Sequence, residues 1–405
     1  MIDTGSTGFM LLAASLVMLM TPGLAFFYGG LATKRNILGI MIQSFVSLGW
    51  TTVLWFIFGY SLCFSGGIGG VIGNFDKAFL HGVTINSMYT NGKIPEIVFI
   101  AYQMMFAIIT PALITGAFVN RVTFKAYIIF LTFWQILVYY PFVHMVWGGG
   151  LLNQMGVIDF AGGIVVHATA GFAALASVFY IGGRMDKKST PNSIPLVAIG
   201  SGLLWFGWYG FNAGSEVAVD HVTAIAFLNT DVAASFATIA WVIIEWIRER
   251  KPKFVGLLTG SIAGLATITP CAGYVPLWAS PIIGTAAGLL CYGAVQWKNR
   301  MKWDDALDVW GVHGVGGFFG TILLGVFASK AINSNGADGL IFGGGAFFMK
   351  QALAVIAASA YAFIFTYIML IIINRITRVR VSEAEEMQGL DYAIHGEQAY
   401  DEGAL

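Results

Sequence analysis

The sequence alternates between apolar runs of roughly 20 residues and short polar segments that hold most of its charge. A helix that crosses about 30 Å of hydrocarbon needs a run of this length. In lipid the backbone N–H and C=O groups find no water, so such runs fold as helices that satisfy them internally. Of the 405 residues, 57% are hydrophobic and 10% are charged, against roughly 25% charged in soluble domains. The sequence therefore predicts an all-α polytopic membrane protein.

About eleven such runs are present. The first begins close to Met1, lacks a basic leader and a small-residue cleavage site, and exceeds a signal-peptide core in length, so we expect it to be retained. We divide the chain into a transmembrane domain, residues 1–375, and a tail, residues 376–405. The predicted spans are 7–30, 38–64, 94–118, 122–147, 159–182, 194–213, 222–247, 254–270, 280–297, 305–328 and 345–374.

Basic residues gather in alternate connections between these spans. Six clusters hold 17 of the 21 Lys and Arg residues. Because cytoplasmic loops are enriched in basic residues, we expect the N-terminus outside the cell membrane and the tail in the cytoplasm. The clusters are Lys34/Arg35, Arg121/Lys125, Arg184/Lys187/Lys188, Arg248/Arg250/Lys251/Lys253, Lys298/Arg300/Lys302 and Arg375/Arg378/Arg380.

Two segments indicate an inverted repeat of five plus five helices, with halves of about 7–182 and 194–328 and an extra helix at about 345–374. The fifth span contains DFAGGIVVHATAG (159–171) and the tenth contains DVWGVHGVGGFFG (308–320). Each places an Asp before a His among glycines. Inverted repeats commonly form transport sites near the membrane midplane.

His167 and His313 each lie one helical turn from glycines, so we expect another helix to approach closely there. Ionisable groups inside a membrane are costly and usually line a pathway or pair with each other. Packing would explain a single such His, but two in matching helices favour function. A dry pore disfavours imidazolium, so we expect neutral rings that share a hydrogen bond between ring nitrogens.

Asp159 stands at the first turn of the fifth predicted span. A carboxylate at that position accepts unpaired backbone N–H groups and is favoured by the positive helix end. It also adds negative potential near the outer mouth.

Common catalytic motifs are missing from the sequence: there is no Walker A, G-x-S-x-G or H-E-x-x-H pattern. Cys63, Cys271 and Cys291 are too few and scattered for a disulfide framework or a metal knuckle. We therefore expect no enzyme, cofactor, metal site or nucleic-acid partner, and an intramembrane enzyme is the remaining alternative of that class.

Five segments resemble the Amt/Rh ammonium transporter family, on the Amt branch of bacteria, archaea and plants. The resemblance covers essentially the whole chain, and the fifth-span motif is highly specific. It implies a homotrimer of eleven-helix subunits, each with its own pore. The segments are PGLAFFYGG (22–30), DFAGGIVVHATAG (159–171), WFGWYGFNAGS (205–215), WGVHGVGG (310–317) and GLDYAIHGEQAY (389–400).

The resemblance also implies roles for individual residues. Trp147 and Ser215 match the family's outer recruitment site, flanked by Phe106, and Phe106 with Phe211 matches two stacked gating rings. Without the resemblance, Trp147 would be assigned to the aromatic belt and the two Phe residues to packing.

The remaining matches lie along the same path. His167 and His313 match the paired pore imidazoles. Residues that support the vestibule are Asp159, Tyr102, Gln103 and Trp208.

Ammonium suits such a site, because aromatic faces attract its charge and a hydroxyl accepts one of its hydrogens. An intact cation in an apolar pore faces a large desolvation penalty. We therefore expect ammonia to cross, alone or with its proton relayed separately. A passive gas channel of the Rh type and an ammonium sensor on the same scaffold are the alternatives; sensors carry an appended signalling domain, which we do not expect here. Methylammonium is a further candidate substrate.

The tail is acidic and polar over residues 382–405, a composition typical of a solvated, partly disordered end. Its match to the family's tail implies a PII-type signalling protein as a cytoplasmic partner.

Overall fold

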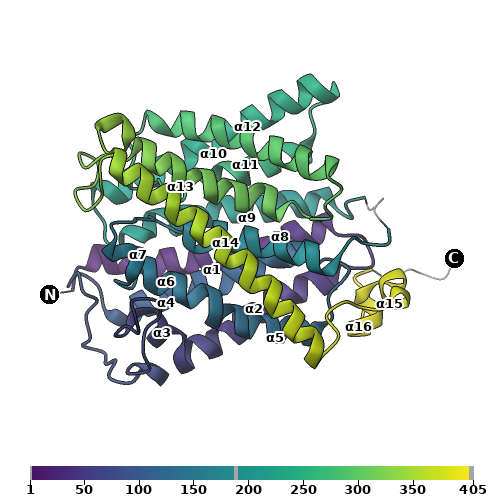
Figure 1. The fold of residues 1–405 in the computed structure, drawn as a ribbon. Helices are drawn as coiled ribbons and strands as arrows, with labels where there is room; N and C mark the ends of the chain where they lie inside the picture. The colour runs from purple at the N-terminus through teal and green to yellow at the C-terminus, as the bar shows by residue number, and fades with distance from the viewer. Residues whose placement is uncertain (1, 187–189, 401–405) are drawn as a thin grey trace.

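The computed structural model describes residues 2–186 and 190–400. Within these residues the chain is helical and contains no β-strand, only isolated bridges. The basic residues Lys187 and Lys188, predicted to face the cytoplasm, and the last five residues of the tail lie outside the described residues. The long helices run side by side between two ends of a bundle, and α14 crosses them obliquely (Figure 1).

Helices occupy every range in which a span was predicted. In residues 2–186 and 190–400, nine helical stretches are long and apolar enough to cross a membrane. The other two are α11, which has 15 residues, and α12, which has 22 residues and ends in a polar, basic turn. The first helices are α1 (Thr4–Leu31), α2 (Ile37–Leu54), α3 (Tyr60–Phe64), α4 (Glu96–Ile114), α5 (Phe124–Trp134), α6 (Tyr140–Val146), α7 (Leu151–Gln154) and α8 (Thr169–Ile181).

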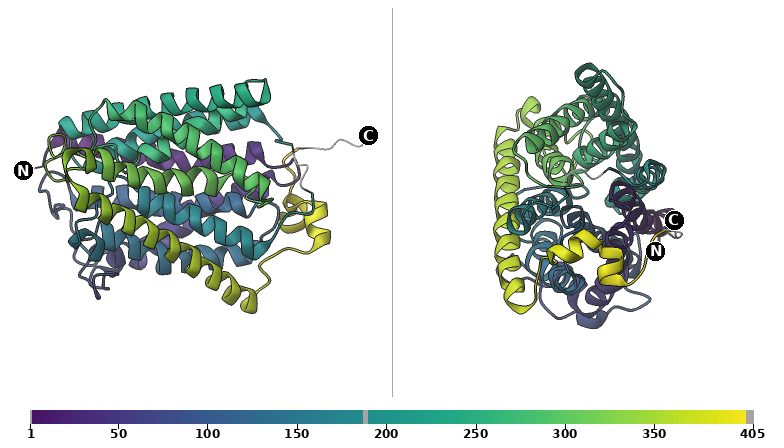
Figure 2. Two further views of the ribbon diagram at one scale, coloured as in Figure 1. Left: turned by 45° about the horizontal axis from the view of Figure 1, so that its top comes forward. Right: turned by 90° about the vertical axis from the view of Figure 1, so that its right-hand side faces the viewer.

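Further helices follow the described part of the 182–193 connection. The chain closes with α14 along the side of the bundle and two short tail helices (Figure 2). These helices are α9 (Ile194–Ala213), α10 (His221–Glu249), α11 (Phe254–Ile268), α12 (Ala279–Arg300), α13 (Val315–Phe327), α14 (Gly345–Ile376), α15 (Glu383–Gln388) and α16 (Leu390–His395).

Several spans contain a π-helical turn, in which one extra residue is inserted into the helical ladder. Such turns join α2 to α3 and α5 to α6, and they precede α8 and α13. The π turns are η1 (Trp55–Gly59), η4 (Gln135–Tyr139), η5 (Gly163–Ala168) and η7 (Trp310–Gly314), and the 3-10 turns are η2 (Ala78–Leu80), η3 (Thr115–Ala117), η6 (Gly214–Glu216) and η8 (Leu340–Phe342).

The first helices of the two predicted halves, α1 and α9, pack antiparallel through glycines. Near the end of α1, a Cβ atom at Gly30 would lie 2.6 Å from the Val197 side chain at the start of α9. Near the end of α9, a Cβ atom at Gly210 would lie 2.7 Å from Cβ of Leu16. Only glycine lets the two backbones approach this closely. These contacts pair the end of α1 with the start of α9, and the opposite direction of the two helices agrees with the inverted repeat.

The fifth segments of the two halves cross in the same way. A Cβ atom at Gly171 would lie 2.1 Å from Cα of Gly314, and one at Gly317 would lie 2.5 Å from the carbonyl oxygen of Gly163. The close helix approach predicted beside the two histidines is therefore confirmed.

The tail is held against the bundle over its described part, in contrast to the solvated end that its composition indicates. Asp391 is 2% exposed and accepts hydrogen bonds from the N–H groups of Ile37 (3.0 Å) and Gly39 (2.7 Å) at the start of α2. Burial raises the pKa of Asp391, and these N–H groups oppose the rise. Arg380 pairs with Glu386 at 2.9 Å. Polar contacts with the start of α2 and within the tail thus hold the described part of this acidic segment in place.

Candidate functional site

The two ends of the bundle are called here the N-terminal side, where α1 begins, and the tail side, where α15 and α16 lie (Figure 1). A cavity of about 180 Å³, the N-side pocket, opens beside the ends of α6 and α9. Its lining includes Gln103, Trp147, Asp159 and Ser215, four of the residues singled out from the sequence. The loop after Ser215 is fixed near the start of α1, because the N–H of Val219 donates to Oγ of Ser6 at 3.1 Å.

Trp147 directly follows α6, and its indole N–H donates a hydrogen bond to the carbonyl oxygen of Asp159 at 2.8 Å. Ser215 lies in η6, where its hydroxyl donates to the carbonyl oxygen of Phe211 at 2.9 Å. Since that bond uses the only hydroxyl hydrogen, the lone pairs of Ser215 Oγ are left to accept. The hydroxyl of Tyr102 donates to the same Phe211 carbonyl at 2.8 Å and lies 3.3 Å from Ser215 Oγ.

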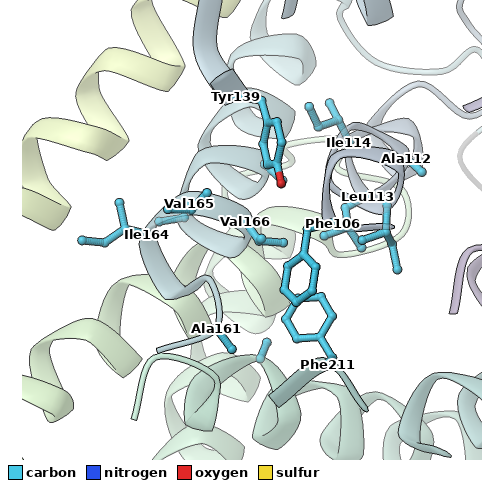
Figure 3. Packing of buried hydrophobic residues seen from close by; sticks show 14 of the residues in the cluster. Phe106, Ala112, Leu113, Ile114, Tyr139, Ala161, Ile164, Val165, Val166 and Phe211 are labelled. Atoms are coloured by element: carbon cyan, nitrogen blue, oxygen red, sulfur yellow. The ribbon is translucent and has the colours of Figure 1, made fainter. Parts of the chain in front are cut away.

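Below the pocket, Phe106 of α4 and Phe211 of α9 face each other (Figure 3). Their ring centroids are 4.2 Å apart and the ring planes differ by 31°. Phe106 also presents its ring edge to Trp147 at 5.9 Å. Both Phe side chains are 1% exposed, and Phe211 also lines the cavity described next.

Beyond the Phe pair lies a small cavity of about 10 Å³, the central cavity. Its lining is apolar apart from His167, His313 and the indole of Trp208. Trp208 is fixed by a 2.9 Å hydrogen bond from its indole N–H to Oγ1 of Thr269, and its ring lies 5.4 Å from that of His167 with 23° between the planes.

The two histidine rings face each other across this cavity. Their centroids are 5.3 Å apart and their planes differ by 16°. Within the described residues, no hydrogen-bond partner is found for either ring nitrogen of His167 or for Nδ1 of His313. The expected hydrogen bond between the two rings is therefore missing, since both ring nitrogens of His167 are without a partner among the described residues.

The sequence placed Asp159 in the first turn of a helix. In the structure it lies outside the helix, four residues before η5. Its carboxylate nevertheless accepts four backbone N–H groups at the start of the π turn, at 2.7 to 3.1 Å. The donors are Gly162, Gly163, Ile164 and Val165. The capping role predicted for Asp159 is thus confirmed, and the bonds fix the turn that carries His167.

The matching residue in the second half is Asp305, which corrects the alignment that paired Asp159 with Asp308. Asp305 precedes His313 by eight residues, as Asp159 precedes His167. The carboxylate of Asp305 accepts the N–H groups of Val309 (3.1 Å) and Trp310 (2.8 Å) at the start of η7.

A second pocket, of about 140 Å³, opens on the tail side. It shares His313 with the central cavity and is lined by Asp308 and Arg184, among others. Arg184 pairs with Asp304 at 2.8 Å, and the fully buried Arg121 lies 3.7 Å from the same carboxylate. Burial alone would raise the pKa of Asp304, but these two cations lower it to about 2. Two pockets thus approach a narrow, largely apolar centre from opposite sides.

A model of the Ammonium Transporter Family matches residues 8–400. The chain belongs to the ammonium transporter family. The ammonium transporter of Bacillus subtilis is 43% identical over 98% of this chain and 99% of its own length. Ammonium transporter Amt1 of Archaeoglobus fulgidus is 41% identical, with 98% and 99% covered.

Solved structures of the same fold are also similar to this ammonium transporter family member. The crystal structure of Candida albicans Mep2 has a TM-score of 0.90 at 35% identity, covering 95% of this chain and 88% of that one. The structure described as Sensor Amt Protein has a TM-score of 0.87 at 29% identity, covering 95% and 96%.

Sequence reasoning missed two parts of this ammonium transporter family site. It did not predict the π turns that carry His167 and His313, and it did not assign Lys298, which contacts Asp305 and Asp308. The shared spacing of eight residues between Asp and His was a usable signal for Asp305. No signal in the sequence pointed to Lys298.

Proposed function

We propose that the protein is an ammonium transporter that captures the cation in the N-side pocket, deprotonates it and conducts ammonia through the central cavity. The observation that carries the proposal is the order of sites along one path. An aromatic and hydroxyl pocket comes first, then two facing phenyl rings, then two facing imidazoles in an apolar cavity.

Capture rests on Trp147 and Ser215, with Phe106 beneath them. The indole face attracts the positive charge, and the indole N–H is already bound to Asp159, so it does not compete for substrate. The Ser215 hydroxyl accepts a substrate hydrogen. Gln103 adds an amide oxygen that has no hydrogen-bond partner within the described chain. The Asp159 carboxylate adds negative potential at this mouth.

Ammonium loses a proton because the pathway beyond Phe106 and Phe211 is too narrow and apolar for a hydrated cation. A phenyl constriction excludes hydrated ions, and the central cavity leaves no room for a hydration shell. Ammonia crosses without the desolvation penalty of a charge. His167 and His313, held neutral by the same dry environment, offer ring nitrogens that bind ammonia and supply a route for the released proton.

The assembly and sidedness belong to the same proposal. The N-terminal side faces the outside of the cell membrane and the tail side faces the cytoplasm, as the basic clusters indicate. The protein is a homotrimer with one pore in each subunit, and residues 376–405 form a regulatory tail. A PII-type signalling protein binds the tail side, and methylammonium is a second substrate.

The tail part can be tested separately by truncation after Arg380. This removes the described helices α15 and α16, so binding of a PII-type protein should weaken in a calorimetric titration. Unchanged affinity would exclude the tail from the interface.

The main test is electrical recording on purified protein in a supported membrane during ammonium pulses. Transport with proton relay gives a current for ammonium and none for potassium, which is similar in size but cannot donate hydrogen bonds or release a proton. Ammonia flux without current would favour the passive gas channel. High-affinity ammonium binding with no flux would favour the sensor.

A further inference from the structure

The two predicted halves present one backbone arrangement at opposite ends of the pathway. Asp159 and Asp305 each cap the π turn that carries a pore histidine. In each case the main-chain carbonyl oxygen of the Asp accepts one side-chain N–H. On the N-terminal side the donor is the Trp147 indole at 2.8 Å, and on the tail side it is Nζ of Lys298 at 2.7 Å.

The third residue after each of these Asp residues is Gly162 in the first half and Asp308 in the second. Gly162 and Asp308 both have positive φ, of 122° and 58°. Positive φ is easy for glycine, and Asp adopts it more readily than most other residues. The carboxylate of Asp308 forms an ion pair with Nζ of Lys298, and Asp308 also lines the tail-side pocket.

Lys298 lies in the last turn of α12, where a basic residue would ordinarily extend into solvent. Instead it is 4% exposed, and its Nζ lies between the Asp305 carbonyl oxygen and the Asp308 carboxylate. A primary ammonium group is a compact, strongly hydrated charge with three N–H donors. Its head group has the same chemistry as the ammonium ion.

We propose that Lys298 is a tethered ammonium group that fills the tail-side counterpart of the capture site and keeps free ammonium from binding there. Capture is then confined to the N-terminal side. Without Lys298, the Asp308 carboxylate and the Asp305 carbonyl would offer a negative charge and an acceptor to any cation in the tail-side pocket. The inference rests on the proposed ammonium transport and adds a residue that sets its direction of capture.

Two single variants and their double variant change the charges of the Lys298–Asp308 ion pair one at a time and together. Lys298→Met keeps a chain of similar length and leaves Asp308 unpaired, so it should lower the half-saturating ammonium concentration from the tail side about tenfold. Asp308→Asn leaves the lysine charge unpaired and should raise that concentration by a similar factor. The double variant restores the net charge of the wild type and should lie within about twofold of it.

The measurement is ammonium uptake into right-side-out and inside-out membrane vesicles, with sidedness assigned by protease access to the tail. Half-saturation from the N-terminal side should stay at the wild-type value in all three variants. Lys251→Met is the matched control, because it removes an exposed tail-side lysine between α10 and α11 and should change neither side. Gel filtration and thermal unfolding establish that each variant is folded.

Opposite shifts of the two single variants, cancelled in the double variant, support the proposal, because a merely structural ion pair would make both single variants worse. Shifts in the same direction, equal changes on both sides, or a tail-side value unchanged in Lys298→Met would overturn it. A wild-type protein without ammonium uptake from either side would instead overturn the proposed function.

Discussion

Replacement of Asp159 by Asn should destabilise the protein about twice as much as the same replacement at Asp305. Each oxygen of the Asp159 carboxylate accepts two backbone N–H groups. The carboxylate of Asp305 accepts two in all, one on each oxygen. An Asn side chain keeps one acceptor oxygen and replaces the other with a donor. Two buried N–H groups therefore lose their partners at residue 159, and one at residue 305.

A buried donor left without a partner costs about 1–3 kcal/mol. The expected loss of folding free energy is thus roughly 2–6 kcal/mol for Asp159→Asn and roughly 1–3 kcal/mol for Asp305→Asn. Because the lost bonds fix the π turn that carries His167, ammonium-elicited current should fall together with stability in Asp159→Asn.

Thermal and denaturant unfolding in one detergent, followed by tryptophan fluorescence, would measure the difference. Asp76→Asn serves as control, because Asp76 lies in an exposed loop and accepts a single exposed side-chain hydrogen bond. Equal unfolding midpoints for the variants at residues 159 and 305, or an unchanged midpoint for Asp159→Asn, would refute the claim that stability falls with the number of N–H groups left without a partner.

Three further changes test the pathway. Replacement of both Phe106 and Phe211 by Ala should open the constriction and admit water and other cations; wild-type selectivity in a potassium competition assay would contradict the gate. Ser215→Leu removes the hydroxyl acceptor and blocks the N-side pocket, so uptake of labelled methylammonium should fall at least tenfold, whereas undiminished uptake would exclude this capture site. His167→Ala or His313→Ala should abolish the ammonium current or separate it from proton movement, and His167→Glu should let potassium compete; unaltered current and specificity in both Ala variants would leave the histidines with a packing role only.

The positions of the spans were predictable because one physical quantity determines them. A run of apolar residues long enough for the bilayer folds as a helix whatever its neighbours are. The predicted fifth span, 159–182, nevertheless begins too early, since the helical part starts at Gly163. Asp159 was counted into the helix, whereas its carboxylate caps the helix from outside.

Parts of the candidate site depend on backbone geometry that residue types do not specify, and they could not be predicted. A π turn differs from an α turn by one hydrogen-bond register, and no residue type in η5 or η7 specifies it. The contact between Lys298 and the carbonyl oxygen of Asp305 depends on how the chain turns back after α12. The roles of Trp147 and Ser215 came from the family resemblance, because a lone indole or hydroxyl carries no functional signal of its own.

The glycine contacts explain why the two histidines share one narrow cavity. Two ordinary helices pack with their axes 8–10 Å apart, and their side chains fill the space between them. At Gly171 and Gly314 the backbones touch, since a single added Cβ would lie 2.1 Å from the opposing Cα. His167 lies one turn before Gly171 and His313 directly precedes Gly314, so both rings are brought into one cavity of about 10 Å³. A water needs about 10–15 Å³ of such volume, so the cavity has room for one molecule of that size. Ammonia is such a molecule, and a cation with even one shell of water is not.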